Sequence, residues 1–494
     1  MSEDTSSQGS ESERESTPAV LESPEEVLTT LKKDGHRRWM HPTVSPGGWL
    51  NLRRVVGYGL IAVFLGLPIV PIGGKPAVLL DLLHREFTFF GLTLYATDTL
   101  LLMVFMLTAL VSIILITAVL GRAWCGWGCP QTVYMELVYR PIEQLLEGPA
   151  ARRIKRDAAD TSFEGFMRKL GKWAIFLVIS LVLAHTFVAY FVGWESLLHW
   201  MTVAPEEHWG YFVLMAAVTG MIMVDFVWFR EQMCTLACPY ARIQSVLLDR
   251  DSLIVSYDPG RGEPRGRHTR NKGKAPVAEA KLALGDCVDC ALCVKTCPTG
   301  IDIRDGLQME CINCTQCIDA CDAVMTKVGK PKGLIRYSSL NVIEKQTPHV
   351  VRPRVIIYAL LLVAGISVFT WLIAGRETID AEIVRPNNGA PFMKLPDGMV
   401  ANRVRFRVQN RSAETAVFHI DATEPTGTEI KYIGNGDLTL EAGQMRHVDA
   451  WIVARPEAFT NGKADASFRV SAEGVAVETG AETTLEFKLL GPWN

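Results

Sequence analysis

Five long runs of apolar residues divide the chain, and each is close to the length that a bilayer requires. A transmembrane helix needs about 20 predominantly apolar residues. The runs occupy residues 55–73, 100–120, 173–194, 211–228 and 354–375. The pattern predicts five transmembrane helices, the last of which is separated from the other four by a long polar segment.

The segments around the first run have a different pattern. Residues 1–48 begin with a stretch rich in Ser, Glu and Asp, a composition typical of a disordered tail. No signal peptide is expected, because the first apolar run begins after residue 50 and no cleavage site follows it. Residues 79–96 mix charged and aromatic side chains, which favours an interfacial or re-entrant segment over a further span.

Beyond residue 375 the hydrophobic period changes to two. Apolar and polar residues alternate in segments such as 402–408, 416–420 and 466–470, and Gly, Asn and Pro punctuate them. About seven short strands of this kind are typical of a β-sandwich. Residues 376–494 are therefore predicted to form an all-β, immunoglobulin-like sandwich.

Lysine and arginine in the loops predict the orientation of the spans. Nine of them lie in residues 121–172, between the second and third spans, and none lies in residues 195–209, between the third and fourth. An excess of basic residues marks the cytosolic side. We expect the N-terminus, residues 121–172 and residues 241–353 on the cytosolic side of a bacterial inner membrane, and residues 376–494 in the periplasm.

The composition agrees with membrane spans combined with soluble domains. Of the 494 residues, 49% are hydrophobic, and the net charge of −3 suggests no nucleic-acid partner. Eight of the 12 cysteines lie in two closely spaced runs and the other four in two pairs. This distribution indicates metal or redox chemistry and not a disulfide framework.

The two cysteine runs have the same spacing, C-x2-C-x2-C-x3-C. The first contains Cys287, Cys290, Cys293 and Cys297, and the second contains Cys311, Cys314, Cys317 and Cys321. In bacterial ferredoxins with this spacing, two [4Fe–4S] clusters are bound and the fourth cysteine of each run ligates the other cluster. We therefore assign one cluster to Cys287, Cys290, Cys293 and Cys321, and the other to Cys297, Cys311, Cys314 and Cys317. Two zinc knuckles are the alternative, but zinc sites usually combine two CxxC pairs.

Two further cysteine pairs follow apolar runs at the same depth. Cys125 and Cys129 lie after the second span and Cys234 and Cys238 after the fourth, and both pairs read C-x3-C-P. Helical residues four apart share one face, so the pairs could bring four thiols together at the membrane surface. We call these four cysteines the edge quartet. Soft thiolates select Cu(I), zinc or iron–sulfur clusters. We expect a catalytic copper site here; a third cluster, a dithiol relay and inert buried thiols are the alternatives.

Other polar residues have simpler interpretations. His185 lies within the third span and Asp225 near the end of the fourth. Hydrogen bonds to neighbouring helices are expected for both, although an ionisable residue inside a span is also a functional candidate. One intramembrane histidine does not supply the paired axial ligands of a haem. Five residues of the outer domain are expected to have packing roles, with copper binding as the alternative: Met393, Met399, Met445, His419 and His447.

Several motifs outside the two runs are distinctive. They read Arg230-Glu231-Gln232, Cys238-Pro239-Tyr240-Ala241-Arg242, Arg261-Gly262-Glu263-Pro264-Arg265-Gly266 and Gly333-Leu334-Ile335-Arg336-Tyr337. Together with the C-x3-C-P pairs, the ferredoxin insert and the outer sandwich, they resemble the CcoG family, also called FixG or RdxA, the accessory proteins of cbb3-type cytochrome oxidase. The resemblance implies a multi-domain inner-membrane polyferredoxin that reduces Cu(II) to Cu(I) for the copper centre of the oxidase.

Two other functions are alternatives. One is an electron-transfer subunit that passes quinol electrons to another redox complex, and the other is a non-enzymatic copper-handling scaffold. No GxGxxG fingerprint occurs in a strand–helix context, so an external electron donor is expected. The other expected partners are copper ions, oxidase assembly factors or copper chaperones, and membrane lipid. The sequence leaves open whether two chains form a homodimer.

Overall fold

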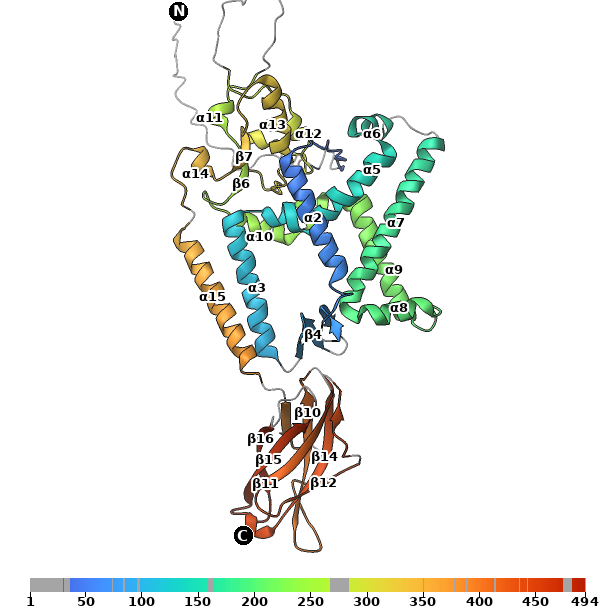
Figure 1. The fold of residues 1–494 in the computed structure, drawn as a ribbon, viewed down its shortest axis with the longest axis vertical. Coiled ribbons are helices and arrows are strands. Elements are labelled where there is room, and N and C mark those ends of the chain that lie inside the picture. The colour runs from blue at the N-terminus through green and yellow to red at the C-terminus, as the bar shows by residue number, and fades with distance from the viewer. Residues whose placement is uncertain are drawn as a thin grey trace, which may run out of the picture. The chain divides into compact units, whose positions relative to one another are not determined.

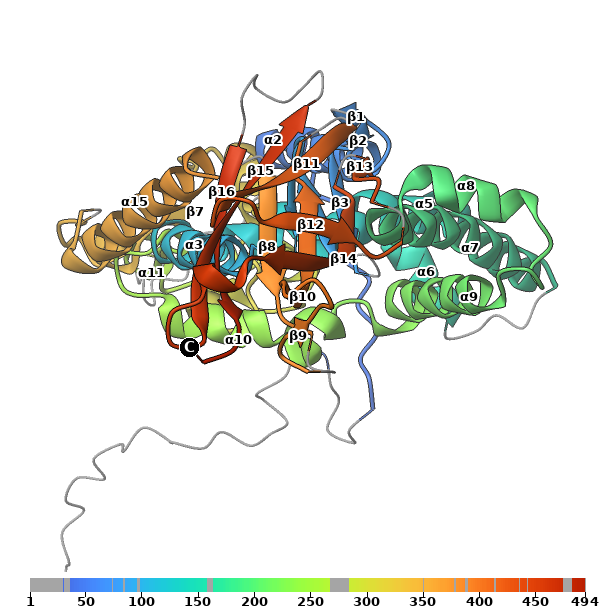
Figure 2. The same cartoon turned by 90° about the horizontal axis from the view of Figure 1, so that it is seen from below.

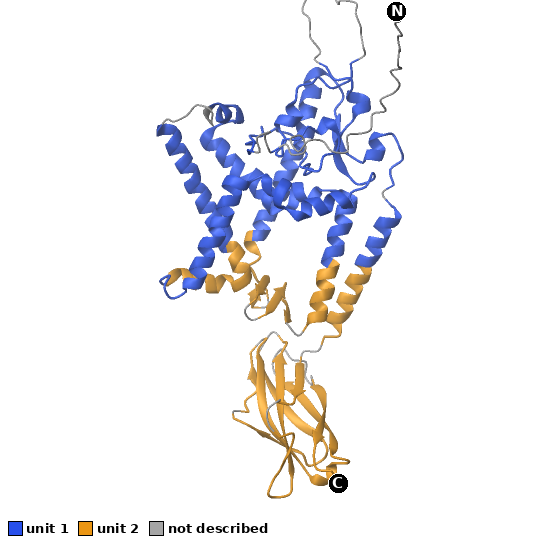
Figure 3. Ribbon diagram, turned by 180° about the vertical axis from the view of Figure 1, so that it is seen from behind, with its two compact units in different colours: residues 1–64, 109–185, 204–362 blue, residues 65–108, 186–203, 363–494 orange. Residues whose placement is uncertain are grey.

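The fold is known from a computed structural model. It describes residues 30, 36–72, 74–82, 85–95, 98–157, 163–266, 284–349, 351–376, 379–386, 390–412, 415–434, 436–441, 443–473 and 482–493. Most of the predicted tail, residues 1–48, thus lies outside the described part. The chain divides into two compact units, coloured separately in Figure 3. Residues 1–64, 109–185 and 204–362 form the first unit, and residues 65–108, 186–203 and 363–494 form the second.

Within the described residues, four helices are long and apolar enough to cross a membrane (Figure 1). They are α3 (Thr99–Leu120), α7 (Phe163–Val192), α9 (Trp209–Val224) with its extension η3 (Asp225–Phe229), and α15 (Pro353–Ala374). They match the second to fifth predicted spans. The absence of charged residues in α3 leaves nothing to oppose burial in lipid.

The first predicted span corresponds to a helix whose ends are shifted along the sequence. Helix α2 (Gly48–Gly66) begins and ends seven residues before the predicted range 55–73, and it does not belong to the four apolar helices. Pro68 explains the early end, because proline lacks a backbone N–H and disfavours helical geometry in the residue before it. The early start reflects a first turn that packs onto the cysteine-rich part of the first unit, as described below.

The described residues between 78 and 95 form β-strands and no further span, as expected, while the interfacial placement of this segment stays a prediction. A three-stranded antiparallel sheet contains β3 (Val78–Asp81), β4 (Glu86–Phe89) and β5 (Leu92–Tyr95). A two-stranded ribbon of β1 (Pro71–Ile72) and β2 (Lys75–Pro76) precedes it. The alternation of apolar and polar residues in β4 and β5 was the overlooked signal.

A buried aromatic cluster holds the helices of the first unit together. The ring of Tyr139 stacks on Phe226 with centroids 4.3 Å apart and meets Phe176 of α7 edge-on at 4.7 Å. These contacts connect α7 and η3 to a helical stretch that follows the first cysteine pair. This stretch contains α4 (Pro130–Tyr134), η2 (Met135–Tyr139), α5 (Arg140–Glu147) and α6 (Ala150–Asp157). In the second unit, α8 (Trp194–Thr202) follows the end of α7.

The cysteine-rich region is built around a short antiparallel ribbon. Strand β6 (Ile254–Tyr257) pairs with β7 (Ile335–Ser338). Val255, Ile318 and Leu334 are buried in the core that surrounds the cysteines. The helices of this region are α10 (Pro239–Leu247), α11 (Pro259–Gly262), α12 (Leu292–Lys295), η5 (Ile303–Asp305), α13 (Gln316–Val328) and α14 (Leu340–Ile343).

The C-terminal region is the predicted β-sandwich. One sheet has the order β12-β14-β10-β8 with β9 paired to β10, and the other has the order β13-β11-β15-β16 (Figure 2). Phe406 and Phe468 meet edge-on between the sheets, with centroids 5.6 Å apart. Nine described strands replace the seven expected: β8 (Ile379–Val384), β9 (Met393–Lys394), β10 (Val400–Asn410), β11 (Ala416–Glu424), β12 (Glu429–Tyr432), β13 (Thr439–Leu440), β14 (Met445–Ala454), β15 (Lys463–Glu473) and β16 (Glu482–Leu490). The 3-10 turn η6 (Pro456–Ala458) precedes β15.

Candidate metal centres formed by the cysteines

The eight cysteines of the two runs line two small cavities, and each cavity combines cysteines from both runs. The first cavity, which we call cavity A, contains Cys287, Cys290, Cys293 and Cys321 among its lining residues. The second, cavity B, contains Cys297, Cys311, Cys314 and Cys317, and Cys293 reaches it as well. Thus Cys297 lies with the second run and Cys321 with the first, which is the placement that crossed cluster ligation requires.

The backbone of both runs adopts the same unusual turn. Asp289 and Asn313 occupy equivalent positions and have φ of 50° and 54°, and Ala291 and Thr315 have φ of 52° and 65°. Residues with a Cβ rarely adopt this left-handed conformation, and such strain concentrates at functional sites. The turns direct the first two thiols of each run into one cavity, and the third thiol follows in the first turn of α12 or α13.

The chemistry of the cavities suits positively charged metal. Burial raises the pKa of the Cys311 thiol to about 11 and that of Cys314 to about 12. In cavity A, burial raises the pKa of Cys321 to about 12. Without metal, these thiols would keep their protons in an apolar surrounding that includes Ile301 and Ile303. Metal binding would displace the protons, as thiolate ligation generally does. The residues present therefore fit one four-iron cluster in each cavity.

The edge quartet lies on two equivalent π-helical turns. Turn η1 (Trp124–Gly128) contains Cys125 and ends at Cys129, and turn η4 (Met233–Ala237) contains Cys234 and ends at Cys238. Both final cysteines have an extended backbone and donate their N–H to the carbonyl five residues earlier. The following proline then begins α4 or α10. Each pair therefore spans a π turn and its C-terminal cap in place of the shared helical face that was expected, and π turns occur frequently at functional sites.

The two turns bring the four thiols of the edge quartet together. Burial raises the pKa of the Cys234 thiol to about 12, and the charges of Cys129, Cys125 and Cys238 add to this increase. The Cys125 thiol donates a hydrogen bond of 2.9 Å to Gln244 Oε1. Among the described residues, no three His, Cys, Asp or Glu side chains converge on the position of a single ion. A cubane cluster spreads its ligands around a larger body, whereas a single copper ion at the edge quartet would have to draw its thiols closer together.

The edge quartet adjoins cavity B directly. Cys125, Ile312 and Cys314 form one buried cluster, against which Cys234 packs. A Cβ atom on Gly126 would lie only 2.8 Å from Asn313 O, so the backbone of η1 is in close contact with the ligand loop of cavity B. The short segment from Ile312 to Cys314 therefore separates the two groups of thiols.

Hydrogen bonds fix this close contact. Arg122 donates to Cys311 O at 3.1 Å and to Ala241 O at 2.6 Å, which connects cavity B to α10. Trp127 Nε1 donates to Asn313 O at 3.3 Å, and Arg53 Nε of α2 donates to Gly126 O at 2.8 Å. Arg53 and Arg122 are buried, so their positive charges are held next to the ligand loop.

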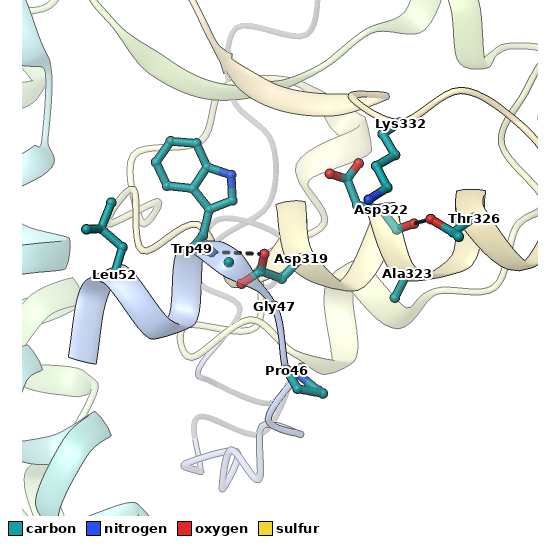
Figure 4. Close-up of a pocket in the computed structure, with 10 residues that line it drawn as sticks. Pro46, Gly47, Trp49, Leu52, Asp319, Asp322, Ala323, Thr326 and Lys332 are labelled. Carbon is teal, nitrogen blue, oxygen red and sulfur yellow. Dashed lines mark hydrogen bonds between the residues drawn. The ribbon is translucent and has the colours of Figure 1, made fainter. Parts of the chain in front are cut away.

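Helix α2 is anchored to the cysteine-rich region by its first turn. Figure 4 shows Asp319 of α13 beside this turn, in a pocket that also contains Lys332. The Asp319 carboxylate accepts hydrogen bonds from the backbone N–H groups of Trp49 at 3.2 Å and Leu50 at 2.7 Å. A carboxylate at a helix N-terminus satisfies free N–H groups and complements the helix dipole. This contact fixes α2 to the helix that carries Cys317 and Cys321.

A buried ionic network was missed in the sequence. Glu143 accepts hydrogen bonds from Arg230 and, at 2.9 Å, from Arg153. Burial alone would raise the pKa of the Glu143 carboxyl, but Arg230 together with Lys172 and Arg153 brings it below its ordinary value. The sequence contained one indication of this network, the distinctive motif Arg230-Glu231-Gln232. The motif lies just before η4, and its three residues are all buried.

The other polar candidates have structural contacts. His185 Nδ1 donates to Leu181 O of its own helix at 2.7 Å, and not to a neighbouring helix as expected. Asp225 accepts a hydrogen bond of 3.1 Å from Gln131 Nε2, as expected.

The outer-domain candidates do not form one group. His419 of β11 and His447 of β14 lie on different sheets, and both are exposed. Met393 of β9 and Met445 of β14 are also exposed, and Met399 only precedes β10. The structure therefore does not assemble these residues into a copper site.

Three family models match the chain. They describe a 4Fe-4S dicluster domain over residues 229–340, a 4Fe-4S binding domain over residues 102–149, and the IG-like fold at the C-terminal of FixG over residues 369–492. The first match contains both cysteine runs and the second pair of the edge quartet. The second match contains Cys125 and Cys129.

Three relatives have similar sequences. RdxB of Cereibacter sphaeroides is 33% identical over 418 residues, which cover 82% of this chain and 86% of that protein. RdxA of the same organism is 32% identical over 403 residues, covering 79% and 82%. The nitrogen fixation protein FixG of Rhizobium meliloti is 39% identical over 265 residues, covering 54% and 49%, so this alignment spans about half of that relative.

Proposed function

Because this chain belongs to the FixG/RdxA family of membrane ferredoxin-like proteins and is a membrane iron–sulfur electron-transfer protein, we propose that its electrons reduce Cu(II) to Cu(I) at the edge quartet. The observation that carries this proposal is the contact between the edge quartet and cavity B. Cys125 and Cys314 share one buried cluster, so a metal held by the quartet would lie next to a cluster ligand. Four-iron clusters in the two cavities would supply one-electron transfer.

The edge quartet has the chemistry to favour the reduced product. Cu(II) gains one electron and becomes Cu(I), which thiolates hold better than hard oxygen ligands do. The thiols of Cys125 and Cys234 have raised pKa values because they are buried, so an arriving copper ion would displace their protons. Gln244 Oε1 accepts the hydrogen bond of the Cys125 thiol, and the same amide is fixed to Thr117 at 3.4 Å, so Gln244 would position the protonated thiol until copper displaces the proton.

The physiological setting follows from the charge distribution. We place the cysteines on the cytosolic side of a bacterial inner membrane and the sandwich in the periplasm, because basic residues are concentrated in residues 121–172. The product would be Cu(I) for the assembly of cbb3-type cytochrome oxidase, handed to an assembly factor or copper chaperone. Two observations support this role: the four thiols of the edge quartet, and a family resemblance that extends through the β-sandwich.

A third iron–sulfur cluster at the edge quartet is the second candidate. It is favoured by the match of residues 102–149 to a 4Fe-4S binding domain, although that segment contains only two cysteines of the quartet. Completing such a cluster would take Cys234 and Cys238 from η4. The protein would then pass electrons through the quartet to another redox complex and would not reduce copper there.

The experiment uses protein purified without oxygen, with reduced clusters and added Cu(II). A Cu(I)-specific chelator and the cluster absorbance are followed together. Cluster oxidation should keep pace with Cu(I) formation, and this rapid phase should be lost in Cys125→Ala and Cys234→Ala. Thr235→Ala, which changes the residue beside Cys234 in η4, is the control and should react like the parent.

Two results would contradict the copper proposal. If both cysteine variants reduce copper as fast as the parent, the quartet is not the copper site. If the parent contains the iron and sulfide of three clusters and each variant contains those of two, the quartet binds a cluster.

A further inference from the structure

A cavity beside the Cys297 loop is not used by the function proposed above. Its volume is about 650 Å³, and it lies between residues 37–43, the first turns of α6, and the segment from Lys295 at the end of α12 to Cys297. A volume of this size is typical of sites for small organic ligands. Cys297 also lines cavity B, so a molecule in this cavity would be next to a cluster ligand.

The N-terminal wall of the cavity is fixed to the cysteine loop. Thr43 N donates to Lys295 O at 2.9 Å, and Thr296 Oγ1 donates to Thr43 O at 2.6 Å. Ser45 Oγ lies 3.1 Å from Thr296 Oγ1 in a further hydrogen bond. The two walls therefore form one local structure, although they are far apart in the sequence.

Apart from Cys297, every charged or ionisable residue that lines the cavity is basic. These residues are Arg37, Arg38, His41 and Lys295. Arg37 Nη2 donates to Glu231 Oε1 at 2.6 Å, while its Nε and Nη1 are buried and have no hydrogen-bond partner in the described structure. Lys295 and Arg38 are exposed at the rim. Such a lining attracts an anion, and guanidinium groups recognise phosphate particularly well.

The rest of the lining is mostly apolar and suits a flat ring system. The indole of Trp39 is 47% exposed, and the Arg37 guanidinium carbon lies 4.0 Å from the centre of its ring. Pro42 and Ile154 line the same space. An aromatic ligand could therefore stack or pack here while its anionic group meets the basic rim.

Building on the proposed function, we propose that this cavity binds a reduced flavin nucleotide, which is the external electron donor. A four-iron cluster accepts one electron at a time, whereas a nicotinamide donor releases a hydride. Flavins and quinols both release single electrons. A quinol head is uncharged and would not use the basic lining, whereas the phosphate of flavin mononucleotide would.

The electron balance fits a chain with two clusters. The flavin hydroquinone loses two electrons and two protons and becomes oxidised flavin. Each of the two clusters gains one electron, and the protons pass to solvent at the open rim. Two Cu(II) ions can then be reduced in succession for each flavin oxidised.

Binding is tested on the purified full-length protein by titration with flavin mononucleotide, using quenching of flavin fluorescence. The parent should bind the flavin, and Arg38→Glu and Lys295→Glu should each weaken binding by about tenfold or more, because each replaces an attraction with a repulsion. Lys327→Glu, at an exposed position of α13 away from the cavity, is the control and should bind like the parent. Riboflavin, which lacks the phosphate, should bind about tenfold more weakly than flavin mononucleotide.

The second measurement is reduction of the clusters by photoreduced flavin mononucleotide, followed by electron paramagnetic resonance without copper. Reduction should be slower in the two charge-reversal variants and unchanged in the control. Equal binding by parent and variants would overturn the proposal, and so would equal binding of riboflavin. Faster reduction by water-soluble menadiol, unaffected by the variants, would assign the donor role to a quinol. Since no step uses copper, failure here is distinct from failure of copper reduction by chemically reduced protein.

Discussion

At the scale of single residues, Cys297 is the most informative cysteine. It belongs to the first run but lines cavity B with Cys311, Cys314 and Cys317. Replacing Cys297 by Ala should therefore remove or convert the cluster bound by the second run, while the other cluster remains intact. Electron paramagnetic resonance of the reduced variant measures this directly, because the two clusters have different surroundings.

Cys290→Ala is the matched comparison for the Cys297 variant. Cys290 lines cavity A only and is exposed, so its loss should affect the other cluster. If Cys297→Ala and Cys290→Ala lose the same cluster, the crossed ligation is wrong.

Glu143 is expected to be essential for the stability of the first unit. Glu143→Gln would leave Arg230 and Arg153 buried without their counter-charge, which costs about 3–5 kcal/mol for a buried ion pair. The pKa of Glu143 is below its ordinary value, so its stabilisation is present above the unfolded pKa of about 4.3 and disappears as the pH falls through the folded pKa.

Thermal unfolding in detergent across the acidic range measures this effect. The parent should lose stability at acidic pH, and Glu143→Gln should already be unstable at neutral pH. Glu164→Gln removes an exposed ion pair with Arg168 and should change stability by less than about 1 kcal/mol. Equal melting temperatures of Glu143→Gln and the parent would show that the network is dispensable.

The sequence predicted the site residues better than their surroundings. The ferredoxin spacing placed Cys297 with the second run, because in this motif the fourth cysteine of a run ligates the other cluster. The sequence did not predict the ion pair of Glu143 with Arg230, because two charged residues that are far apart in the sequence produce no periodic pattern. Nor did it predict the side-chain hydrogen bond of Cys125 to Gln244.

At the scale of elements, the π turn η1 sets the contact between the edge quartet and cavity B. Gly126→Ala would place a methyl group against the backbone of Ile312 and Asn313, and relief of this clash costs about 1–3 kcal/mol. The variant should retain both clusters but reduce copper more slowly than the parent, because η1 must move away from the ligand loop. Stopped-flow absorbance measures the rate.

Gly171→Ala is the control for the η1 variant. A Cβ at Gly171 of α7 meets no other atom within 4 Å, and alanine favours a helix more than glycine does. Its clusters and copper rate should match those of the parent. A Gly126→Ala protein with the parental rate would show that close contact at η1 is not required.

Helices could be predicted from the sequence where one physical cause, contact with lipid, determined their hydrophobic pattern. Helices α3, α7, α9 and α15 are apolar because they meet lipid, and their positions follow from composition. Helix α2 combines a first turn that contacts Asp319 and Trp127 with an apolar second half, so its ends cannot be placed by hydropathy. Strands β3 to β5 are too short to outweigh the aromatic residues that suggested an interfacial segment.

At the scale of the whole molecule, the orientation in the membrane is open to direct measurement. Alkaline phosphatase fused after residue 380 should be active in cells, and a fusion near residue 270 should be inactive, because this enzyme folds only where disulfides form. A fluorescent protein that matures in the cytosol should give the opposite pattern. Activity of phosphatase at residue 270 would place the cysteines outside and contradict the proposed delivery of copper.

The pairing of the two cysteine runs also determines an order of events during synthesis. A ribosome releases the chain from its N-terminus at about 5–20 residues per second, so the edge quartet is complete at Cys238, before any ferredoxin cysteine exists. Cavity B is completed only at Cys317, and cavity A at Cys321. The nascent chain therefore contains the four thiols that we propose to bind copper before either ferredoxin cavity has its full set of cysteines. The earliest time at which iron can be delivered to both complete cavities is after α13 has been translated and before α15 is inserted.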